Sequence, residues 1–196
     1  MYNITLLKKY SLLVHNLAGN EDKVKNGCDL VITGCRNFTS DAFARVIESV
    51  INDNSIKVKR AYSGGMNGID MLGEWYAIKH GIRVCGFPVE HGLFDKTGRD
   101  DVLLLIWDGK SNRSKGIKEN ALRRGVVIFE VVCDIETIEL IENPAIRVTQ
   151  AIKKALIMSD GYCPCSPKRD DDHICPCLKF REYGECCCGL FIEKNW

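Results

Sequence analysis

The stretch DLVITG at residues 29–34, followed by SDAFARVIESVIN at residues 40–52, decides the fold of this chain. The first stretch is a short apolar run that ends in glycine, as is typical of a buried strand. The second places its apolar residues at helical spacing, and Ser40 and Asp41 are residue types that favour the start of a helix. Residues 29–52 therefore predict a strand followed by a helix.

The same alternation of strand and helix patterns continues to about residue 133. Gly81 and Gly125 come directly after two of the helical patterns, where glycine commonly ends a helix. Apolar strands that alternate with helices are typical of a parallel sheet that is covered on both faces. We therefore expect an α/β domain with further strands at 56–62, 82–86, 102–107 and 126–132 and further helices at 66–80 and 114–124.

Two other segments flank this α/β domain, which we place at residues 29–142. Residues 1–28 have no assigned role, although their leucines have the spacing of an amphipathic helix. Residues 143–196 begin with a helix after Pro144 and continue into a segment rich in proline, cysteine and charge. That segment has too few large apolar residues to fold on burial alone, and a metal cluster would supply the missing stabilisation. The sequence thus predicts a second, small α-rich iron–sulfur domain.

The composition sets limits on the partners. The chain has 196 residues, of which 45% are apolar and 27% are charged, and its net charge is +1. This balance gives no electrostatic reason to expect a nucleic acid or an acidic membrane as a partner. The N-terminus lacks the features of a signal peptide and the apolar runs are too short to cross a bilayer, so we expect a cytoplasmic protein. In that reducing compartment, clustered cysteines indicate a metal or catalysis more often than structural disulfides.

Seven of the eleven cysteines lie in the last thirty-four residues, as CPC at 163–165, CPC at 175–177 and CCC at 186–188. Seven thiols leave one over after simple pairing into disulfides, and they exceed the four ligands that zinc takes. Four thiolates for an iron–sulfur cluster and two more for a redox-active pair would use about six of them. A structural zinc site and an iron–sulfur cluster without disulfide chemistry are the alternatives.

These motifs resemble the catalytic subunit of ferredoxin–thioredoxin reductase. The matching pieces are YCPC at 162–165, ICPC at 174–177 and the two outer cysteines of 186–188, with SDGY at 159–162, EYG at 182–184 and GLFI at 189–192. The resemblance covers about residues 143–193. It implies a [4Fe-4S] cluster and an active-site disulfide. The implied cluster ligands are Cys163, Cys175, Cys177 and Cys186, and the implied redox pair is Cys165 and Cys188.

The same resemblance implies the activity and the partners. Such an enzyme is an oxidoreductase that takes electrons from ferredoxin and reduces the disulfide of thioredoxin or a related redoxin. Cys165 would be the exposed nucleophile, and Cys188 would lie against the cluster. The chain departs from the plant-type enzyme in two ways: only nine residues, 166–174, separate the two CPC motifs, and Cys187 replaces a histidine thought to help move protons. His173 is a candidate substitute for that histidine.

A glycine-rich turn, YSGGMNGID at 62–70, lies between an expected strand and an expected helix. Such glycines let the backbone approach a phosphate closely, and the start of a helix favours an anion. TGCR at 33–36 and DGKS at 108–111 close two other strands, and ligands of α/β sheets bind outside the carboxyl ends of the strands. We expect a pocket there, with these candidate residues: Gly34, Arg36, Ser63, Gly64, Gly65, Asp70, Asp108 and Gly109. The alternative is that the glycines serve helix–sheet packing only.

This domain resembles the Rossmann-like SLOG superfamily, which is related to the DprA and LOG-type nucleotide-binding proteins. The matching pieces span about residues 29–132 and are VITGCRNFT at 31–39, SGGMNGID at 63–70, FP at 87–88 and IWDGKS at 106–111. The resemblance implies a Rossmann-like fold and a nucleotide-type ligand. Residues 90–101 are shorter than in the family and keep only Arg99 of a polar pair, which favours ligand binding over catalysis. As an alternative to the reductase, the chain would be a nucleotide-binding redox sensor whose cluster is regulatory.

Overall fold

The computed structural model describes residues 2–86 and 101–194. The chain forms two compact units. We call residues 7–135 the α/β unit, and residues 1–6 together with 136–196 the cysteine unit. Two of the motif pieces named above, FP at 87–88 and Arg99, lie outside the described residues.

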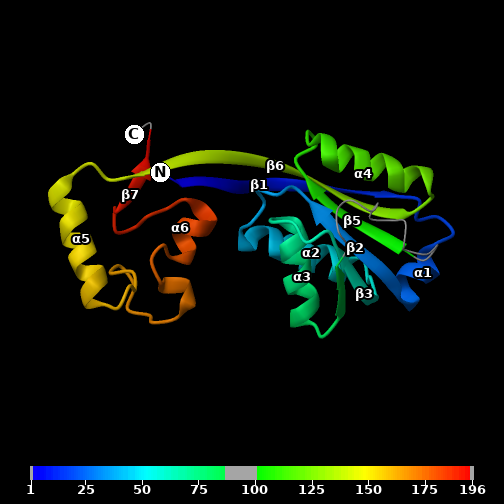
Figure 1. Ribbon diagram of the computed structural model, residues 1–196, viewed down its shortest axis with the longest axis horizontal. Coiled ribbons are helices and arrows are strands. Elements are labelled where there is room, and N and C mark those ends of the chain that lie inside the picture. Colours follow the sequence, from blue (N-terminus) through cyan, green and yellow to red (C-terminus); the bar gives the residue numbers. More distant parts are fainter. Residues whose placement is uncertain (1, 87–100, 195–196) are drawn as a thin grey trace. The chain divides into compact units, whose positions relative to one another are not determined.

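A mostly parallel sheet forms the centre of the α/β unit (Figure 1). Its strands are β1 (Tyr2–His15), β2 (Cys28–Gly34), β3 (Val58–Ser63), β4 (Arg83–Gly86), β5 (Asp101–Trp107) and β6 (Val127–Glu142). They lie in the order β1-β6-β5-β2-β3-β4, and every neighbouring pair from β6 to β4 in this order is parallel. From β2 the chain builds the sheet outwards through β3 and β4, and then returns to the other side of β2 with β5 and β6.

Helices cover both faces of this sheet. α2 (Asp41–Asp53) and α3 (Ile69–Lys79) lie on one face, and α4 (Asn112–Arg123) lies on the other (Figure 1). A short helix, α1 (Glu21–Asn26), precedes β2. Because crossovers between parallel strands are right-handed, the reversal of direction at β2 places the later helix on the opposite face. The α/β class with helices on both faces is therefore confirmed.

The core of the α/β unit lies where the apolar runs predicted it. All residues of β2 and all residues of β5 are buried, as a strand with both faces covered requires. α2 turns the apolar side of its helical pattern inwards, and Phe43 stacks on Phe38 with ring centroids 4.2 Å apart. The buried residues of α2 are Phe43, Val46, Ile47, Val50 and Ile51.

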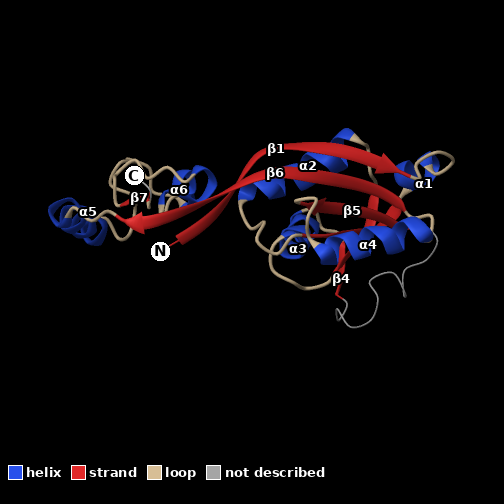
Figure 2. Cartoon of the chain, turned by 90° about the horizontal axis from the view of Figure 1, so that it is seen from above, coloured by secondary structure: helices blue, strands red, loops and turns tan. Residues whose placement is uncertain are grey.

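The N-terminal segment is a strand, so the helix expected from its leucine spacing was wrong. Lys9 Nζ lies 3.7 Å from Asp134 Oδ2, and His15 Nε2 lies 2.7 Å from Glu130 Oε2. As the residue numbers increase along β1, those of the contacted residues on β6 decrease, so the two strands are antiparallel. Figure 2 shows them side by side. Pairing with the neighbouring strand outweighs the weak local preference for a helix. The same pairing carries β6 beyond its expected end at residue 132, to Glu142.

The cysteine unit has a small apolar core. It contains α5 (Ile146–Met158), a 3-10 turn (Asp171–His173), α6 (Leu178–Tyr183) and β7 (Phe191–Glu193), which pairs with Leu140–Glu142 of β6. Long loops connect these elements and carry the cysteines (Figure 1). Its buried apolar side chains, among the described residues, are Leu140, Cys163, Phe180 and Leu190. In neither unit is any described helix long and apolar enough to cross a membrane.

Candidate functional site

Backbone contacts hold the two CPC motifs of the cysteine unit side by side. Tyr162 and Ile174, each directly before a CPC motif, form an antiparallel bridge. The Cys163 N–H donates to the His173 carbonyl oxygen at 2.7 Å. The proline in each motif fixes one backbone angle, which stiffens the turn between its two cysteines. The bridge therefore brings the first cysteines of both motifs, Cys163 and Cys175, to the same place in the fold.

Three thiols converge in this unit. The Sγ atoms of Cys163, Cys165 and Cys188 all lie within 4.8 Å of one another, close enough to share one metal ion. Cys163 Sγ lies 3.2 Å from Cys165 Sγ, and Cys186 Sγ lies 3.5 Å from Cys188 Sγ. The structure thus places the expected redox pair, Cys165 and Cys188, together and beside one expected cluster ligand, Cys163. We call Cys163, Cys165 and Cys188 the three-thiol group.

The other expected cluster ligands do not belong to the three-thiol group. In the described part of the chain, this group is the one set of three or more His, Cys, Asp or Glu side chains that converge closely enough to hold an ion. Cys177 still reaches Cys163 through a side-chain hydrogen bond, and Cys186 contacts Cys188. A cysteine metal site is therefore possible here, and the ligand set Cys163, Cys175, Cys177 and Cys186 stays a prediction.

The thiols of the three-thiol group differ in charge and exposure. Burial opposes the thiolate of Cys163, but hydrogen bonds from the Cys165 backbone and from neighbouring thiols outweigh it and lower the pKa of Cys163. Burial and the contact with Cys163 raise the pKa of Cys165, which is exposed, to about 11. Burial also raises the pKa of Cys188. Cys163 therefore forms the thiolate, which is the form that binds a metal cation, more readily than Cys165 and Cys188 do.

Cys187, at the position of the family histidine, is exposed. Lys179 lies beside it: the pKa of Lys179 is raised by its ion pair with Glu185 and by a hydrogen bond with the Cys187 thiol. The Lys179 Nζ lies 2.8 Å from Glu185 Oε2. His173, the candidate substitute, contacts Asp170 through Nδ1. The structure thus places a lysine next to Cys187, a contact that the sequence analysis missed because Lys179 lies on α6, before the last motif.

A second candidate site lies in the α/β unit, at the carboxyl ends of β2, β3 and β5. Thr33, near the end of β2, donates a hydrogen bond to Asp70 Oδ1 at 2.7 Å. Asp70 lies in the first turn of α3 and is 1% exposed. Arg113, in the first turn of α4, reaches the same carboxylate, with Nη2 3.7 Å from Asp70 Oδ2. We call Thr33, Gly64, Asp70, Arg113 and Ser114 the strand-end site.

Three buried polar atoms of the strand-end site lack a hydrogen-bond partner among the described residues. They are Asp70 Oδ2, Arg113 Nη1 and Ser114 Oγ. Ser114 is fully buried in the first turn of α4, next to the thiol of Cys35. Leaving a buried polar group unsatisfied costs about 1–3 kcal/mol, so native proteins keep such a group only where something else requires it.

Two expected pocket residues besides Asp70 lie at the centre of the strand-end site. A Cβ at Gly34 would lie 1.8 Å from the Ile106 carbonyl oxygen, so only glycine lets β2 approach β5 at this point. A Cβ at Gly64 would lie 2.7 Å from Asp70 Oδ2 and 3.5 Å from Arg113 Nη2, so glycine lets the turn pack closely against these two side chains. Both glycines thus serve close packing at the strand ends.

The remaining expected residues build the turns or face the solvent. Ser63 Oγ accepts a hydrogen bond from the Gly65 N–H at 3.0 Å, which stabilises the glycine-rich turn. Asp108 Oδ1 accepts from the backbone amides of Lys110 and Ser111, each at 2.9 Å, and thereby fixes the turn that contains Gly109. Burial opposes the charge of Asp108, but these hydrogen bonds keep its pKa below the ordinary value. Arg36 is exposed.

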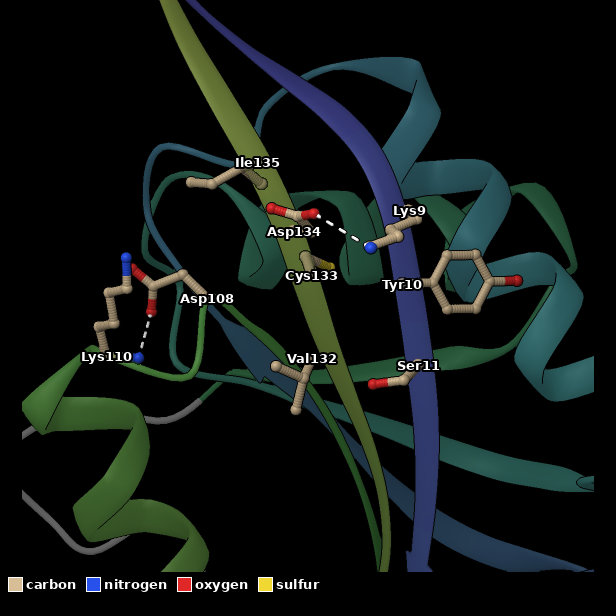
Figure 3. A pocket seen from close by; sticks show the side chains of 9 residues that line it. All are labelled: Lys9, Tyr10, Ser11, Asp108, Lys110, Val132, Cys133, Asp134 and Ile135. Atoms are coloured by element: carbon tan, nitrogen blue, oxygen red, sulfur yellow. Dashed lines mark hydrogen bonds and ion pairs between the residues drawn. The ribbon is translucent and has the colours of Figure 1, made fainter.

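A cavity of about 370 Å³ lies elsewhere in the α/β unit, between β1, β6 and the turn after β5 (Figure 3). Lys9 and Asp134 point toward each other in Figure 3 and form an ion pair at 3.7 Å. Asp108 also lines the cavity, and its carboxylate already accepts hydrogen bonds from the backbone amides of its own turn. The acidic groups of the cavity are therefore satisfied, unlike those of the strand-end site.

The sequence analysis missed three members of the strand-end site: Thr33, Arg113 and Ser114. Arg113 and Ser114 lie in the stretch 111–116, directly after a buried strand that ends at the same edge of the sheet. Polar residues in the first turn of a helix that follows such a strand point to the ligand edge, and this was the available signal. The identity of their partner, Asp70, could not be read from the sequence because it lies on another helix.

No protein-family model, curated protein or solved structure matches this chain. The two resemblances described above therefore stay predictions from the sequence. Both sites are interpreted below from their own residues and contacts.

Proposed function

We propose that the cysteine unit is an iron–sulfur disulfide reductase, which takes electrons from ferredoxin and reduces the disulfide of thioredoxin or a related redoxin. The observation that carries this proposal is the three-thiol group, in which Cys165 and Cys188 lie within 4.8 Å of each other and of Cys163. A redox-active pair needs two sulfurs close enough to form a disulfide without large backbone movement. Electron supply to that pair needs a metal-bound thiolate beside it, the role that we give to Cys163.

The residues fit an iron–sulfur cluster. We give the ligand roles to Cys163, Cys175, Cys177 and Cys186, because such clusters are held by thiolates. The Tyr162–Ile174 bridge supports a shared centre for the two CPC motifs, and the lowered pKa of Cys163 favours the thiolate form that a metal needs. Bound there, a [4Fe-4S] cluster would supply electrons one at a time.

The thiols of the chain would carry out the disulfide exchange. The exposed Cys165, as a thiolate, attacks one sulfur of the substrate disulfide, so the substrate S–S bond breaks and a mixed disulfide forms. The leaving sulfur takes up a proton. Cys188 then attacks the Cys165 sulfur, which releases the second substrate thiol and leaves a Cys165–Cys188 disulfide. Two electrons from two molecules of reduced ferredoxin, together with two protons, return that disulfide to the dithiol.

Metal analysis of anaerobically purified protein tests the cluster. We expect about four iron and about four acid-labile sulfide per chain, because a [4Fe-4S] cluster contains that number of each. Zinc without sulfide would contradict the reductase and identify a structural metal site at the three-thiol group.

Cysteine variants test the exchange. With reduced ferredoxin as donor, Cys165→Ser and Cys188→Ser should each lose reduction of thioredoxin disulfide, since one thiol cannot complete the two-step exchange. Cys85→Ser is the control, because Cys85 lies on β4 of the α/β unit and should keep full activity. Full activity of either Cys165→Ser or Cys188→Ser would contradict the mechanism.

We also propose that the α/β unit is Rossmann-like and binds a nucleotide-type ligand at the strand-end site. The strand order β4-β3-β2-β5-β6 corresponds to the order 3-2-1-4-5 of doubly wound folds, whose ligands bind where the strand order reverses. In this chain that point lies between β2 and β5. The three unsatisfied polar atoms of the strand-end site favour a ligand there. Titration calorimetry with AMP tests this proposal, and absence of binding would contradict it.

These two proposals distinguish the reductase from the alternative, a nucleotide-binding redox sensor. A reductase turns over thioredoxin disulfide whether or not AMP is present. A sensor would show no turnover, and its AMP affinity would change when the cluster is reduced.

A further inference from the structure

Cys165 is the member of the three-thiol group that faces the solvent. It is exposed, whereas Cys163 is 4% exposed and Cys188 is half-buried. A disulfide that arrives from solution therefore reacts first at Cys165 and leaves a mixed disulfide there, which a second thiol of the chain then resolves. The oxidised product depends on which thiol lies within reach of Cys165.

Cys163 lies in contact with Cys165. The two Sγ atoms are 3.2 Å apart, and a shift of about 1 Å brings them to the length of a disulfide bond. Only Pro164 separates the two residues, and its ring restricts the backbone of the turn that holds both thiols. This proximity is local. The proximity of Cys188, which lies within 4.8 Å, instead requires that the last cysteine motif folds onto the first.

The second CPC motif has the same sequence but a different arrangement. In the described structure the Cys177 thiol contacts Cys163, in the first motif, and not Cys175. Cys175 and Cys177 are also both half-buried, so neither is as accessible as Cys165. The sequence CPC alone therefore does not produce an exposed thiol in contact with its neighbour, and the second motif is an internal control for the first.

A bound cluster changes which thiol can react with Cys165. In the proposed enzyme Cys163 is a cluster ligand, so its sulfur is not available to resolve a mixed disulfide. Cys188 is then the remaining member of the three-thiol group. In the chain without a cluster, Cys163 is a free thiol that already contacts Cys165.

We propose that Cys165 has two resolving partners and that the cluster selects between them: Cys188 in the loaded enzyme and Cys163 in the cluster-free chain. The inference rests on the proposed function and adds a redox regulation of the same site. In the cluster-free chain the Cys165 thiolate attacks a small disulfide, such as oxidised glutathione, and one glutathione leaves with a proton. Cys163 then attacks the Cys165 sulfur and releases the second glutathione. Two thiols of the chain are thus oxidised to one disulfide, and one disulfide is reduced to two glutathione thiols.

This disulfide withdraws a proposed cluster ligand. Cluster ligation needs the Cys163 thiolate, and a sulfur in a disulfide cannot serve as that ligand. An oxidising environment would therefore close the unloaded enzyme to cluster assembly until a dithiol reduces the Cys163–Cys165 bond.

Disulfide mapping on the full chain tests the choice of partner. Trypsin places the three cysteine motifs in separate peptides, 155–168, 170–179 and 182–194. The reduced, cluster-free chain is treated with oxidised glutathione without oxygen, and the remaining thiols are then blocked with N-ethylmaleimide during denaturation. Peptide 155–168 should appear unlabelled and unlinked, with an internal disulfide, while peptide 170–179 should stay labelled. In the loaded enzyme the same treatment should instead link peptide 155–168 to peptide 182–194.

Iron uptake gives a second readout. After the glutathione treatment, the cluster-free wild type should take up iron and sulfide only once dithiothreitol has reduced it. Cys165→Ser should take them up without that reduction, because it cannot form the disulfide and Cys165 is not a proposed ligand. Cys188→Ser should still form the internal disulfide in peptide 155–168, since its reaction partner is Cys163.

The outcomes separate the inference from the proposed function. A link between peptides 155–168 and 182–194 in the cluster-free chain, or a peptide 155–168 that carries only glutathione, would overturn the inference and leave the reductase in place. An internal disulfide in peptide 155–168 of the loaded enzyme would overturn the selection by the cluster. A reduced chain that forms the internal disulfide but takes up no iron and sulfide would confirm the pairing of Cys163 with Cys165 and contradict the proposed function.

Discussion

The α/β unit and the cysteine unit are stabilised in different ways. The α/β unit buries two complete strands and the inner side of α2 in one apolar core. In the cysteine unit, large apolar side chains such as Ile157 and Met158 are exposed, at 80% and 77%, and few are buried. A domain with so little burial usually needs a metal or cross-links to fold. We therefore expect the clustered thiols to stabilise the cysteine unit as well as to carry out its chemistry.

The cysteines of the two units differ in the same way. In the α/β unit, burial raises the pKa of Cys28 to about 12, of Cys35 to about 11 and of Cys133 to about 12. All three thiols are surrounded by core residues, and Cys28 and Cys133 behave as small apolar side chains, whereas the Cys35 thiol donates a hydrogen bond to Asp108 Oδ1 at 3.6 Å. In the cysteine unit, burial also raises the pKa of Cys165, to about 11, but there the thiols contact one another, as Cys163 and Cys165 do. The position of a cysteine in the fold therefore determines whether it is structural or reactive.

Removal of the metal should have the largest effect and should act on one unit only. Treatment with a chelator under reducing conditions should unfold the cysteine unit, because metal binding and folding are coupled in small metal-stabilised domains. The α/β unit should stay folded on its apolar core. Hydrogen exchange followed by mass spectrometry of peptides checks this: protection should disappear in residues 143–194 and persist in β2 and β5.

Uniform loss of protection in both units would contradict this division, since it would mean that the units fold as one. Unchanged protection in both would show that the cysteine unit is stable without a metal. Cys163→Ala is the matched variant, because it removes a proposed ligand that also belongs to the three-thiol group.

Substitution of Phe129 by alanine should have the next largest effect. Phe129 lies on β6 in the core of the α/β unit and is 1% exposed. Phe-to-Ala changes in cores cost about 3–5 kcal/mol, because apolar contacts are lost and a cavity remains. Urea unfolding should show this loss. Phe180→Ala, in the cysteine unit, should instead lower metal retention, and an equal loss of α/β stability from Phe180→Ala would contradict the independence of the units.

The sequence predicted the fold where one face or both faces of an element are buried. The run at 102–107 became β5 because a fully buried strand must be apolar throughout. The leucines of residues 1–17 had helical spacing, yet those up to Leu13 lie in β1, since Leu6, Leu7 and Leu12 are only half-buried and pairing with β6 decides the conformation. Local pattern is weak evidence for a segment at the sheet edge.

The sites could be predicted as regions but not as sets of atoms. The spacing of the cysteines located the thiol centre, but it could not show that Cys163, Cys165 and Cys188 converge, because this depends on how three loops fold. The glycine-rich turn located the edge of the sheet and identified Asp70. Its unsatisfied Oδ2 and the opposing Arg113 became visible only when two helix starts met in space.

Alkylation should distinguish the buried cysteines of the α/β unit from those of the cysteine unit, and we expect an effect of intermediate size. With iodoacetamide near neutral pH, Cys28, Cys35 and Cys133 should react at least ~100-fold more slowly than the exposed Cys165 of metal-free, reduced protein, because their burial blocks access of the reagent. Mass spectrometry of the labelled peptides checks the rates. Fast labelling of Cys133 in folded protein would show that the α/β core opens readily.

Replacement of Glu130 should have the smallest effect and should depend on pH. Glu130 is buried on β6 and accepts hydrogen bonds from His15 at 2.7 Å, Trp107 at 3.0 Å and Lys118 at 2.8 Å. Glu130→Gln should lower the free energy of unfolding by about 1–3 kcal/mol near neutral pH, because these bonds to a charged acceptor weaken. Metal content of the cysteine unit should not change.

The pH dependence follows from the direction in which the pKa of Glu130 is shifted in the folded chain. Burial alone would raise this pKa, but hydrogen bonds from Lys118 and His15 and the charge of Lys118 lower it below its ordinary value of 4.5. As the pH falls, Glu130 takes up its proton at a higher pH in the unfolded chain than in the folded chain. The stabilisation is therefore fully present above the pKa of the unfolded chain, and it is lost as the pH falls through the pKa of the folded chain. The difference in unfolding free energy between wild type and Glu130→Gln should therefore shrink below about pH 4.5. A difference that stays constant from neutral to acidic pH would show that the charge of Glu130 does not stabilise the α/β unit.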